Sequence, residues 1–421
     1  MPPVKVAIIG SGISGLTVAS HLHPDFDIAV YESASWIGGH TNTIDVPVGN
    51  DHLSIDTGFI VFNDRTYPNF IAMLDRLGVA SQNAPMTFSV RCDRSNLEYR
   101  GADFGGLFAQ KRNLLRPKFY RLLKGILKFN KVGSQLLDND AEDVTVKEFF
   151  QQNNFPREFY DYYFLPMGSA IWSCPQSTFE NFPIRFIAEF YHHHGLLSVN
   201  NRPQWKVVCG GSNSYVEPLT APFRERIFLD TPVQRVVREP DQVVIESKRG
   251  KESFDHVVFA CHADQAIRLL AERATKQERE ILNAFPYEEN QAVLHTDDGI
   301  LPKRRRAWAS WNYLLPDRQT EKASLTYCMN ILQTLDHQET FSVTLNNTSR
   351  INPDKIIRTI NYSHPIFDVR RKTMQDRHSE LIGDNRSSFC GAYWGNGFHE
   401  DGVVSGLAVV DVLKNPKPDS H

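Results

Sequence analysis

The 421-residue chain lacks the features of metal-binding, secreted and membrane-spanning proteins. Its six cysteines are scattered and form no Cys-x-x-Cys pair, so the sequence indicates no zinc site and no redox dithiol, and we expect no metal. No segment approaches the roughly 20 apolar residues that cross a bilayer, so any membrane contact would be peripheral. No signal peptide is visible, and we expect a reduced, cytoplasmic protein. A net charge of −3 argues against nucleic-acid partners.

The clearest motif is an apolar, β-branched run followed by Gly10-Ser11-Gly12-Ile13-Ser14-Gly15 and a predicted helix. Gly10 permits a tight turn, Gly12 lets the backbone approach a pyrophosphate, and Gly15 lets the helix pack on the strand. A second apolar run ends in Glu32, close to the roughly twenty-residue distance expected of a carboxylate that binds a ribose hydroxyl. The motif predicts a dinucleotide site, and the alternative is a tight turn that binds nothing. Glu32 argues against NADP and leaves NAD and FAD open.

The stretch Ile-Gly-Gly-His-Thr-Asn-Thr at residues 37–43 resembles the extended FAD fingerprint of the amine oxidase, phytoene desaturase and protoporphyrinogen oxidase superfamily. Its two glycines and final threonine match, whereas His40 stands where arginine is usual. Residues 56–60 resemble the superfamily's segment beside the isoalloxazine ring; a plain strand end with a glycine turn is the alternative.

Residues 388–408 read as a strand, a glycine-rich turn and a helix, and they resemble the C-terminal flavin motif of the same superfamily. Two distant glycine turns of this kind are expected for FAD and not for NAD. No cysteine lies in a motif for covalent attachment, so we expect noncovalent FAD. In the superfamily the residue matching Val233 contacts adenine through its backbone, and Ala260 ends a strand near the dinucleotide. The resemblance implies these cofactor-binding residues: Gly10, Gly12, Ile13, Ser14, Gly15, Glu32, Ser33, Gly38, Gly39, His40, Thr41, Thr43, Thr57, Gly58, Phe59, Ile60, Val233, Ala260, Glu400, Asp401, Gly402 and Val403.

The resemblance implies an α/β fold with a Rossmann-like FAD-binding domain and an inserted α+β substrate domain, as in amine oxidases. We expect the FAD-binding domain to comprise residues 1–80, 202–290 and 365–421. The substrate domain would then comprise residues 81–201 and 291–364.

Residues 111–131 are basic and apolar, and no acidic residue occurs between Asp103 and Asp138. Leu115, Phe119 and Leu122 belong to a set of apolar residues at helical spacing. A helix with basic and apolar faces can lie on an anionic membrane surface. It can equally pack its apolar face on the protein core, and the sequence leaves both interpretations open.

Three segments resemble a narrower group, the bacterial flavoproteins that accompany cyclopropane-fatty-acid synthases: residues 37–43, 307–313 and 397–402. This resemblance implies an enzyme that acts on acyl chains of membrane phospholipids. One branch resembles the flavin-dependent desaturase of furan fatty acid biosynthesis, which converts a methyl-branched unsaturated chain to a diene. We therefore expect hydride transfer to flavin N5, reoxidation by O2, and a methyltransferase or oxygenase as protein partner. One alternative is a flavin amine oxidase, but the sequence has no counterpart to the flavin-facing lysine of those enzymes. Another alternative is a flavin-bearing lipid-binding partner of a methyltransferase.

Candidate proton acceptors are His399 and Tyr393, which flank the C-terminal turn. His399 suits the role because its unperturbed pKa is about 6.5, although it could instead only hydrogen-bond the cofactor. Alternating aromatic residues suggest a strand with one aromatic face, which is either a substrate wall or a core face. The candidate substrate residues are Trp308, Trp311, Asn312 and Trp394.

Overall fold

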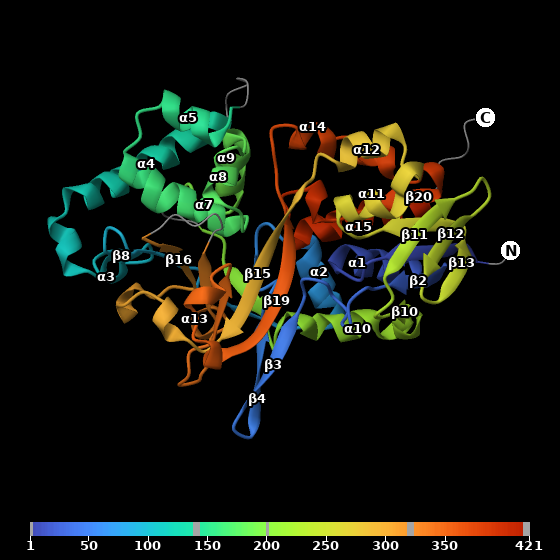
Figure 1. Cartoon of the computed structure of the whole chain (residues 1–421), viewed down its shortest axis with the longest axis horizontal. Coiled ribbons are helices and arrows are strands. Elements are labelled where there is room, and N and C mark those ends of the chain that lie inside the picture. Colours follow the sequence, from blue (N-terminus) through green and yellow to red (C-terminus); the bar gives the residue numbers. More distant parts are fainter. Residues whose placement is uncertain (1–2, 138–143, 199–201, 318–323, 416–421) are drawn as a thin grey trace.

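The computed structural model describes residues 3–137, 144–198, 202–317 and 324–415, which form two lobes (Figure 1). One lobe is built on a five-stranded parallel sheet with the strand order β10-β2-β1-β14-β20. Strands from the start, middle and end of the described chain thus meet in one sheet. Its strands are β1 (Lys5–Ile9), β2 (Asp27–Tyr31), β10 (Ile227–Phe228), β14 (His256–Phe259) and β20 (Ser387–Phe389).

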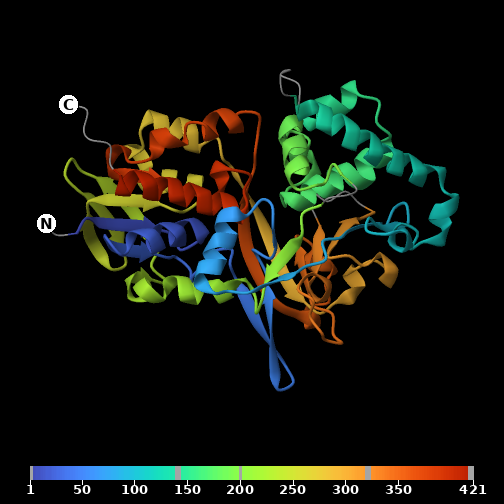
Figure 2. The same ribbon diagram turned by 180° about the vertical axis from the view of Figure 1, so that it is seen from behind.

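Helices α1 (Ile13–Leu22) and α15 (His399–Lys414) lie side by side on this sheet, although they come from opposite ends of the sequence (Figures 1 and 2). Beyond the sheet lie an antiparallel meander and two short helices. These elements are β11 (Val233–Arg238), β12 (Val243–Ser247), β13 (Gly250–Phe254), α11 (Ala263–Leu270) and α12 (Lys276–Leu282). The observed strand–turn–helix at residues 5–22 has the order that the glycine motif predicted.

The second lobe contains a seven-stranded sheet with the order β19-β15-β18-β17-β16-β7-β8, antiparallel except where β16 pairs with β7. Two long strands, β15 (Tyr287–His295) and β19 (Ile356–Pro365), pair along their whole length and run between the lobes (Figure 1). The other strands are β7 (Phe88–Cys92), β8 (Leu97–Arg100), β16 (Trp311–Leu315), β17 (Leu325–Cys328) and β18 (Ser342–Leu345).

A helical layer covers the second lobe at the top left of Figure 1. Its elements are α3 (Phe104–Leu107), a 3-10 turn (Lys111–Leu115), α4 (Pro117–Leu137), α5 (Val146–Gln152), α6 (Arg157–Phe159), a π-helical turn (Tyr160–Phe164), α7 (Leu165–Ile171), α8 (Gln176–Phe179) and α9 (Ile184–His193). Helix α5 follows the N-cap residue Thr145, which forms a capping box with Glu148.

Helix α4 packs its apolar face on the core. Of the two interpretations of residues 111–131, the structure therefore supports core packing for this face. Phe119, Leu122 and Phe129 are almost fully buried. A Cβ on Gly125 would lie 2.2 Å from the Phe159 side chain, so the helix approaches α6 closely. Leu115, by contrast, precedes the helix and is 87% exposed. The predicted apolar face is therefore not free to enter a bilayer.

Smaller elements complete the fold. β3 (Thr43–Val48) and β4 (Asp51–Asp56) form a hairpin that projects from the molecule (Figure 1). Helix α2 ends at Gly78, whose φ is +67°. The remaining elements are α2 (Pro68–Leu77), β5 (Phe62–Asn63), β6 (Ser81–Asn83), β9 (Trp205–Val208), α10 (Val216–Thr220), α13 (Met329–Leu332) and α14 (Arg371–Gln375).

Two of the predicted domain boundaries coincide with the long strands β15 and β19. The boundary at 290/291 lies inside β15, and the boundary at 364/365 lies at the end of β19. β6, just past the boundary at 80/81, pairs with β9. The lobes are thus joined by unbroken strands. Within the described residues, no helix combines the length and hydropathy needed to cross a membrane.

Candidate flavin site

The three glycines of the first turn have different environments. A Cβ on Gly10, whose φ is +106°, would lie 2.6 Å from the Ala260 carbonyl oxygen. A Cβ on Gly15 would lie 2.0 Å from the Gly10 carbonyl oxygen. A Cβ on Gly12 would meet no atom within 4 Å. Gly10 and Gly15 are therefore required by packing, whereas Gly12 faces open space in front of the α1 N-terminus, where a pyrophosphate would bind.

Glu32 ends β2 beside this turn and is 7% exposed. Its carboxylate accepts hydrogen bonds from the Ser11 backbone N–H (2.9 Å), the Ser11 hydroxyl (2.7 Å) and the Ala34 backbone N–H (2.8 Å). The Glu32 carbonyl accepts from Thr231 (2.7 Å), which brings the start of the Val233 strand next to the acid. These bonds hold the carboxylate in one orientation, as a ribose-binding acid requires.

The second glycine pair folds against the first turn. Gly38 donates its N–H to the Ser11 carbonyl at 3.0 Å and forms a β-bridge with Gly12. A Cβ on Gly39, whose φ is +59°, would lie 3.2 Å from the Gly12 Cα. The first glycine turn and the Gly38–Gly39 pair are therefore in contact. Together they form a cradle lined by glycine backbone, where one cofactor was predicted to bind.

His40 occupies the position where the superfamily usually has arginine. Its ring stacks on Tyr362 at 4.8 Å between centroids and meets the His364 ring edge-on at 5.3 Å. Burial, followed by the nearby His364, His262 and His399, lowers the pKa of His40 well below its usual value. Its Nε2 has no hydrogen-bond partner among the described residues. Position 40 thus offers a ligand one hydrogen bond from a neutral ring and no positive charge.

Thr41, Tyr215 and His399 form a buried hydrogen-bonded chain. The Tyr215 hydroxyl lies 2.6 Å from Thr41 Oγ1 and 2.7 Å from His399 Nε2. The His399 ring also stacks on Phe59 at 3.7 Å, with 8° between the ring planes. Burial lowers the pKa of His399 to about 3. This geometry disfavours the prediction that His399 is a catalytic base, because its Nε2 is occupied and its ring stays neutral; a packing and hydrogen-bonding role fits instead.

Tyr393 is also a poor base. Its side chain is 1% exposed and packs against Phe285 and Trp394. Burial raises the pKa of the phenol well above its usual value, so the group keeps its proton at neutral pH. The Tyr393 hydroxyl and the Trp394 indole N–H are both buried and make no hydrogen bond of good geometry within the described residues. They can serve as donors to a ligand.

The start of α15 corrects the prediction for Glu400. One Glu400 carboxylate oxygen accepts from the backbone and the side-chain amide of Asn69, and the other accepts from the Phe70 N–H. The carboxylate therefore caps the N-terminus of α2 and is not free to contact the cofactor. Asp401 likewise accepts from the Phe398 N–H at 2.8 Å, and burial raises the pKa of its carboxyl to about 6.

Gly402 brings the two N-terminal helix ends together. A Cβ on Gly402 would lie 2.7 Å from Ile13 Cγ2 and 2.9 Å from Ser14 Oγ. Val403 beside it is buried. The N-termini of α1 and α15 therefore meet, and their partial positive charges add in one region. An anionic or electron-rich ligand would be stabilised there.

Two other predicted side chains are used within the protein. The Thr43 hydroxyl donates to Asp56 at 2.6 Å and accepts from the Asn213 N–H at 3.0 Å. The Asn312 amide accepts from Ser89 and Ala309 and donates to the backbone carbonyls of Ala309, just before β16, and of Thr326 on β17. Asn312 is therefore part of the sheet core rather than a substrate residue.

The predicted tryptophans differ in environment. Trp308 donates its indole N–H to the Pro302 carbonyl at 2.7 Å and lies under Arg305. Trp311 is half-buried, packs edge-on against Tyr327 at 5.3 Å, and its indole N–H has no partner in the described part of the chain. Trp394 stacks on His378 at 4.0 Å. The three are thus not one aromatic wall.

Tyr362 is a central residue that sequence reasoning missed. Its hydroxyl lies 3.0 Å from the Asn42 amide nitrogen and 2.8 Å from Thr57 Oγ1, and its ring supports His40. His364, two positions further on the same strand, faces the same side because strand side chains alternate. The alternation of tyrosine and histidine along residues 362–364 was the only available signal. Gly58 packs under this group, since its Cβ would lie 2.4 Å from the His40 carbonyl oxygen.

Most of the remaining predicted residues lie beside the first turn. Ser33 is exposed and lies beside the Glu32 carboxylate, while Ile13 and Ser14 open α1. Ile60 is buried in a satellite core. Among the described residues, no group of three or more histidine, cysteine, aspartate or glutamate side chains could hold a metal ion.

Comparison with known proteins identifies the family. Residues 13–295 match the family of flavin-containing amine oxidoreductases. A putative flavin-containing monoamine oxidase, AofH, from Mycobacterium tuberculosis is 22% identical over 324 residues, which cover 73% of this chain and 66% of that protein, slightly less than two thirds of its length. Because the family match covers well over half of the chain, the protein belongs to the flavin-containing amine oxidoreductase family.

Solved structures share the fold. A putative protoporphyrinogen oxidase from Exiguobacterium sp. 255-15 aligns with a TM-score of 0.69 at 14% identity, over 99% of this chain and 100% of the other. A CLA-producing fatty acid isomerase from P. acnes aligns with a TM-score of 0.66 at 15% identity, over 99% of each chain. The predicted superfamily, α/β fold, FAD cofactor and oxidoreductase class are confirmed. The open space at Gly12, the oriented Glu32 and the unpaired His40 Nε2 fit FAD.

Proposed function

We propose that the protein is an FAD-dependent oxidoreductase that acts on acyl chains of membrane phospholipids. Its reaction would be the desaturation of a methyl-branched unsaturated chain to a diene, with O2 as the final electron acceptor. A methyltransferase that adds the branch, or an oxygenase that uses the diene, would be its functional partner. When bound, FAD would supply the acceptor for the two electrons that leave the acyl chain.

The observation that carries this proposal is an aromatic junction between the helical layer and the C-terminal turn. The Phe190 ring stacks on Phe398 at 5.1 Å, just before the start of α15. Trp172 packs against Phe190 at 4.9 Å and donates its indole N–H to the Asn396 carbonyl at 3.4 Å. Phe186 meets Phe367 at 5.6 Å. Trp172, Phe186, Phe190 and Phe367 are nearly fully buried, so the protein is apolar and aromatic beside the flavin turn. An apolar environment there suits a long apolar substrate better than a small polar one.

The side chains near the turn support orientation rather than strong acid–base catalysis. His399 and Tyr393 have pKa values shifted away from neutrality in opposite directions. Neither therefore accepts a proton readily at neutral pH. A hydrogen next to a double bond is only weakly acidic, so accurate placement of the chain contributes more to the rate than a base does.

The likeness to the fatty acid isomerase gives independent support for a lipid substrate. That protein's name assigns it fatty acid chemistry on the same fold. The family name and the mycobacterial relative favour a second candidate, oxidation of an amine, because aromatic rings also bind cations.

The test is anaerobic reduction of the purified flavoprotein. We expect the flavin to bleach with phospholipid that carries a methyl-branched unsaturated chain, and to bleach more slowly or not at all with the unbranched unsaturated analogue. Bleaching by primary amines but not by either lipid would establish the amine oxidase instead. Oxidised flavin in every arm, despite lipid binding, would identify a lipid-binding partner of another enzyme.

A further inference from the structure

Exposed apolar side chains concentrate on one part of the helical layer. Four of the eleven large apolar side chains that are exposed in the described residues lie between positions 114 and 127: Leu114, Leu115, Tyr120 and Leu127. Leu115 and Leu127 are 87% and 62% exposed. Contiguous exposed apolar surface on a water-soluble fold commonly marks a contact site.

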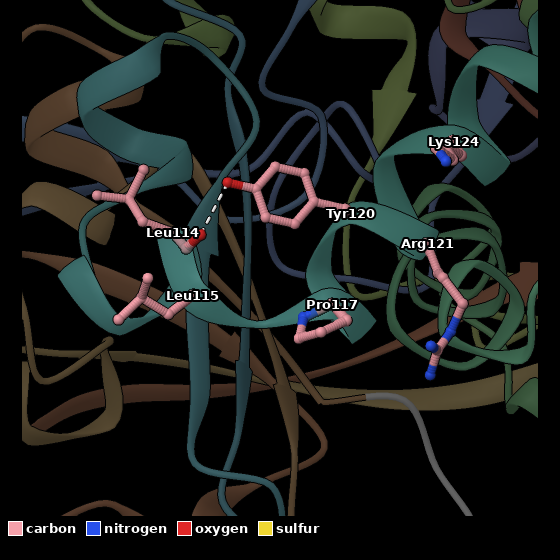
Figure 3. A pocket seen from close by; sticks show the side chains of 6 residues that line it. All are labelled: Leu114, Leu115, Pro117, Tyr120, Arg121 and Lys124. Carbon is pink, nitrogen blue, oxygen red and sulfur yellow. Dashed lines mark hydrogen bonds between the residues drawn. The ribbon is translucent and has the colours of Figure 1, made fainter.

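These side chains lie together on the outer side of α4. Leu114, Leu115, Pro117 and Tyr120 line a hollow of about 460 Å³ with Arg121 and Lys124 (Figure 3). The Tyr120 hydroxyl donates to the Leu114 carbonyl at 2.9 Å and joins the turn to the helix. Leu127 lies seven residues after Tyr120, so it falls on the same helix face. Lys131 lies seven residues after Lys124 and shares that face as well. We call the set Leu114, Leu115, Tyr120, Leu127, Lys124 and Lys131 the α4 patch.

The charge of this surface has one sign. Residues 104–137 contain eight lysines and arginines and no acidic residue, in a chain whose net charge is −3. Four of the cations have partners within the protein. Arg121 pairs with Glu158 at 2.7 Å, Lys128 donates to the Asn154 carbonyl, and Arg112 and Arg116 donate to nearby polar groups. The exposed lysines of the α4 patch have no ion-pair partner among the described residues.

We propose that the α4 patch docks the protein on an anionic phospholipid bilayer. The lysines would lie at the level of the headgroups, and Leu115 and Leu127 would enter the interface between them. The inner apolar face of α4 remains in the protein core, so the contact is shallow and reversible. Exposed aliphatic side chains between the cations favour a lipid surface over nucleic acid, whose phosphates would leave them in water. This inference goes beyond the proposed reaction and does not depend on the substrate.

Vesicle sedimentation tests the proposal with two variants. The charge variant is Lys124→Gln with Lys131→Gln, and it leaves Arg121 and Lys128 in place because they hold α4 to its neighbours. The apolar variant is Leu115→Ser and Leu127→Ser. The matched control, Val369→Ser with Lys248→Gln, changes an exposed valine and an exposed lysine on other elements.

We expect the wild type to bind vesicles made of an equimolar mixture of phosphatidylcholine and phosphatidylglycerol. Its binding to vesicles of phosphatidylcholine alone should be weak. Each lysine near an anionic surface raises partitioning about fivefold, so the charge variant should bind roughly 25-fold more weakly. The apolar variant should lose roughly tenfold or more. The control should match the wild type, and added salt should weaken binding.

Three results would overturn the proposal: no binding of the wild type to anionic vesicles, equal losses in the control, or tighter binding to duplex DNA than to vesicles. Thermal melts confirm that each variant is folded. Flavin reduction by detergent-dispersed phospholipid should be unchanged in the charge variant, because the α4 patch is not part of the flavin site. Failure of docking is thereby distinguished from failure of the proposed reaction.

Discussion

At the scale of single residues, the glycines of the first turn have different roles: Gly12 leaves room for the cofactor, whereas Gly15 is needed for packing. Gly12 has an ordinary φ of −66° and open space where a methyl group would lie, so Gly12→Ala should fold normally. The methyl group would occupy the place of the pyrophosphate, and FAD should be lost. We expect the apoprotein's free energy of unfolding to change by less than about 0.5 kcal/mol, measured by denaturant titration beside cofactor content.

Gly15→Ala is the matched comparison. Its methyl group would overlap the Gly10 carbonyl oxygen, and we expect a loss of about 1–3 kcal/mol in the apoprotein. If both substitutions lower stability equally, Gly12 is a packing residue and the assignment of the open space to a ligand is wrong.

The same scale shows what could be predicted from sequence. Gly10, Gly15 and Glu32 could be predicted because their roles depend on a local strand–turn–helix pattern. The environment of His399 could not, because it depends on Tyr215, which is distant in sequence and lies next to His399 only in the folded protein. Glu400 was placed at the cofactor for the same reason: a motif shows residue types but not which groups have already taken their hydrogen bonds.

At the scale of elements, Glu400 joins the start of α15 to the start of α2. Glu400→Gln replaces an acceptor oxygen by an N–H₂ group that would face the N–H donors of Asn69 and Phe70. We expect a loss of about 1–3 kcal/mol in the free energy of unfolding. Glu217→Gln, at an exposed position on α10, is the control. A loss of FAD affinity at unchanged stability would restore Glu400 to the cofactor site.

Helix α4 illustrates the limit of periodicity at this scale. The spacing of Phe119, Leu122 and Leu123 correctly predicted a helix with one apolar face. It could not show what covers that face, because the covering residues, Phe159 among them, come from later segments. The alternation that suggested an aromatic wall at residues 308–313 likewise described a strand whose Asn312 is satisfied by its own sheet.

At the scale of the whole molecule, buried histidines set the response to acid. Burial lowers the pKa values of His194, His256, His295, His364 and His378 to about 4 and that of His399 to about 3. In the unfolded chain these groups take up protons below about pH 6.5. Their contribution to stability is therefore complete above pH 6.5 and is lost as the pH falls towards 4.

Asp56 and Asp401 act in the opposite direction. Burial raises the pKa of each carboxyl to about 6, so their contribution is present below about pH 4 and is lost as the pH rises through 6. The histidines outnumber them, and we expect net destabilisation between pH 6.5 and 4. His295→Gln should reduce the slope of stability against pH by about 1.4 kcal/mol per pH unit. Denaturant titrations across this range measure the slope; equal slopes in both proteins would contradict the assignment.

The meeting of α1 and α15 has a consequence for biosynthesis. Residues 10–15 leave the ribosome long before residues 399–403, which pack against them, and before β20, which pairs with β14. Nascent chains that end before α15 should consequently remain without flavin, whatever the cellular supply. Until β20 is made, the edge of β14 that pairs with it stays open. Unpaired, apolar strand edges of this kind make a nascent chain prone to aggregation and dependent on chaperones.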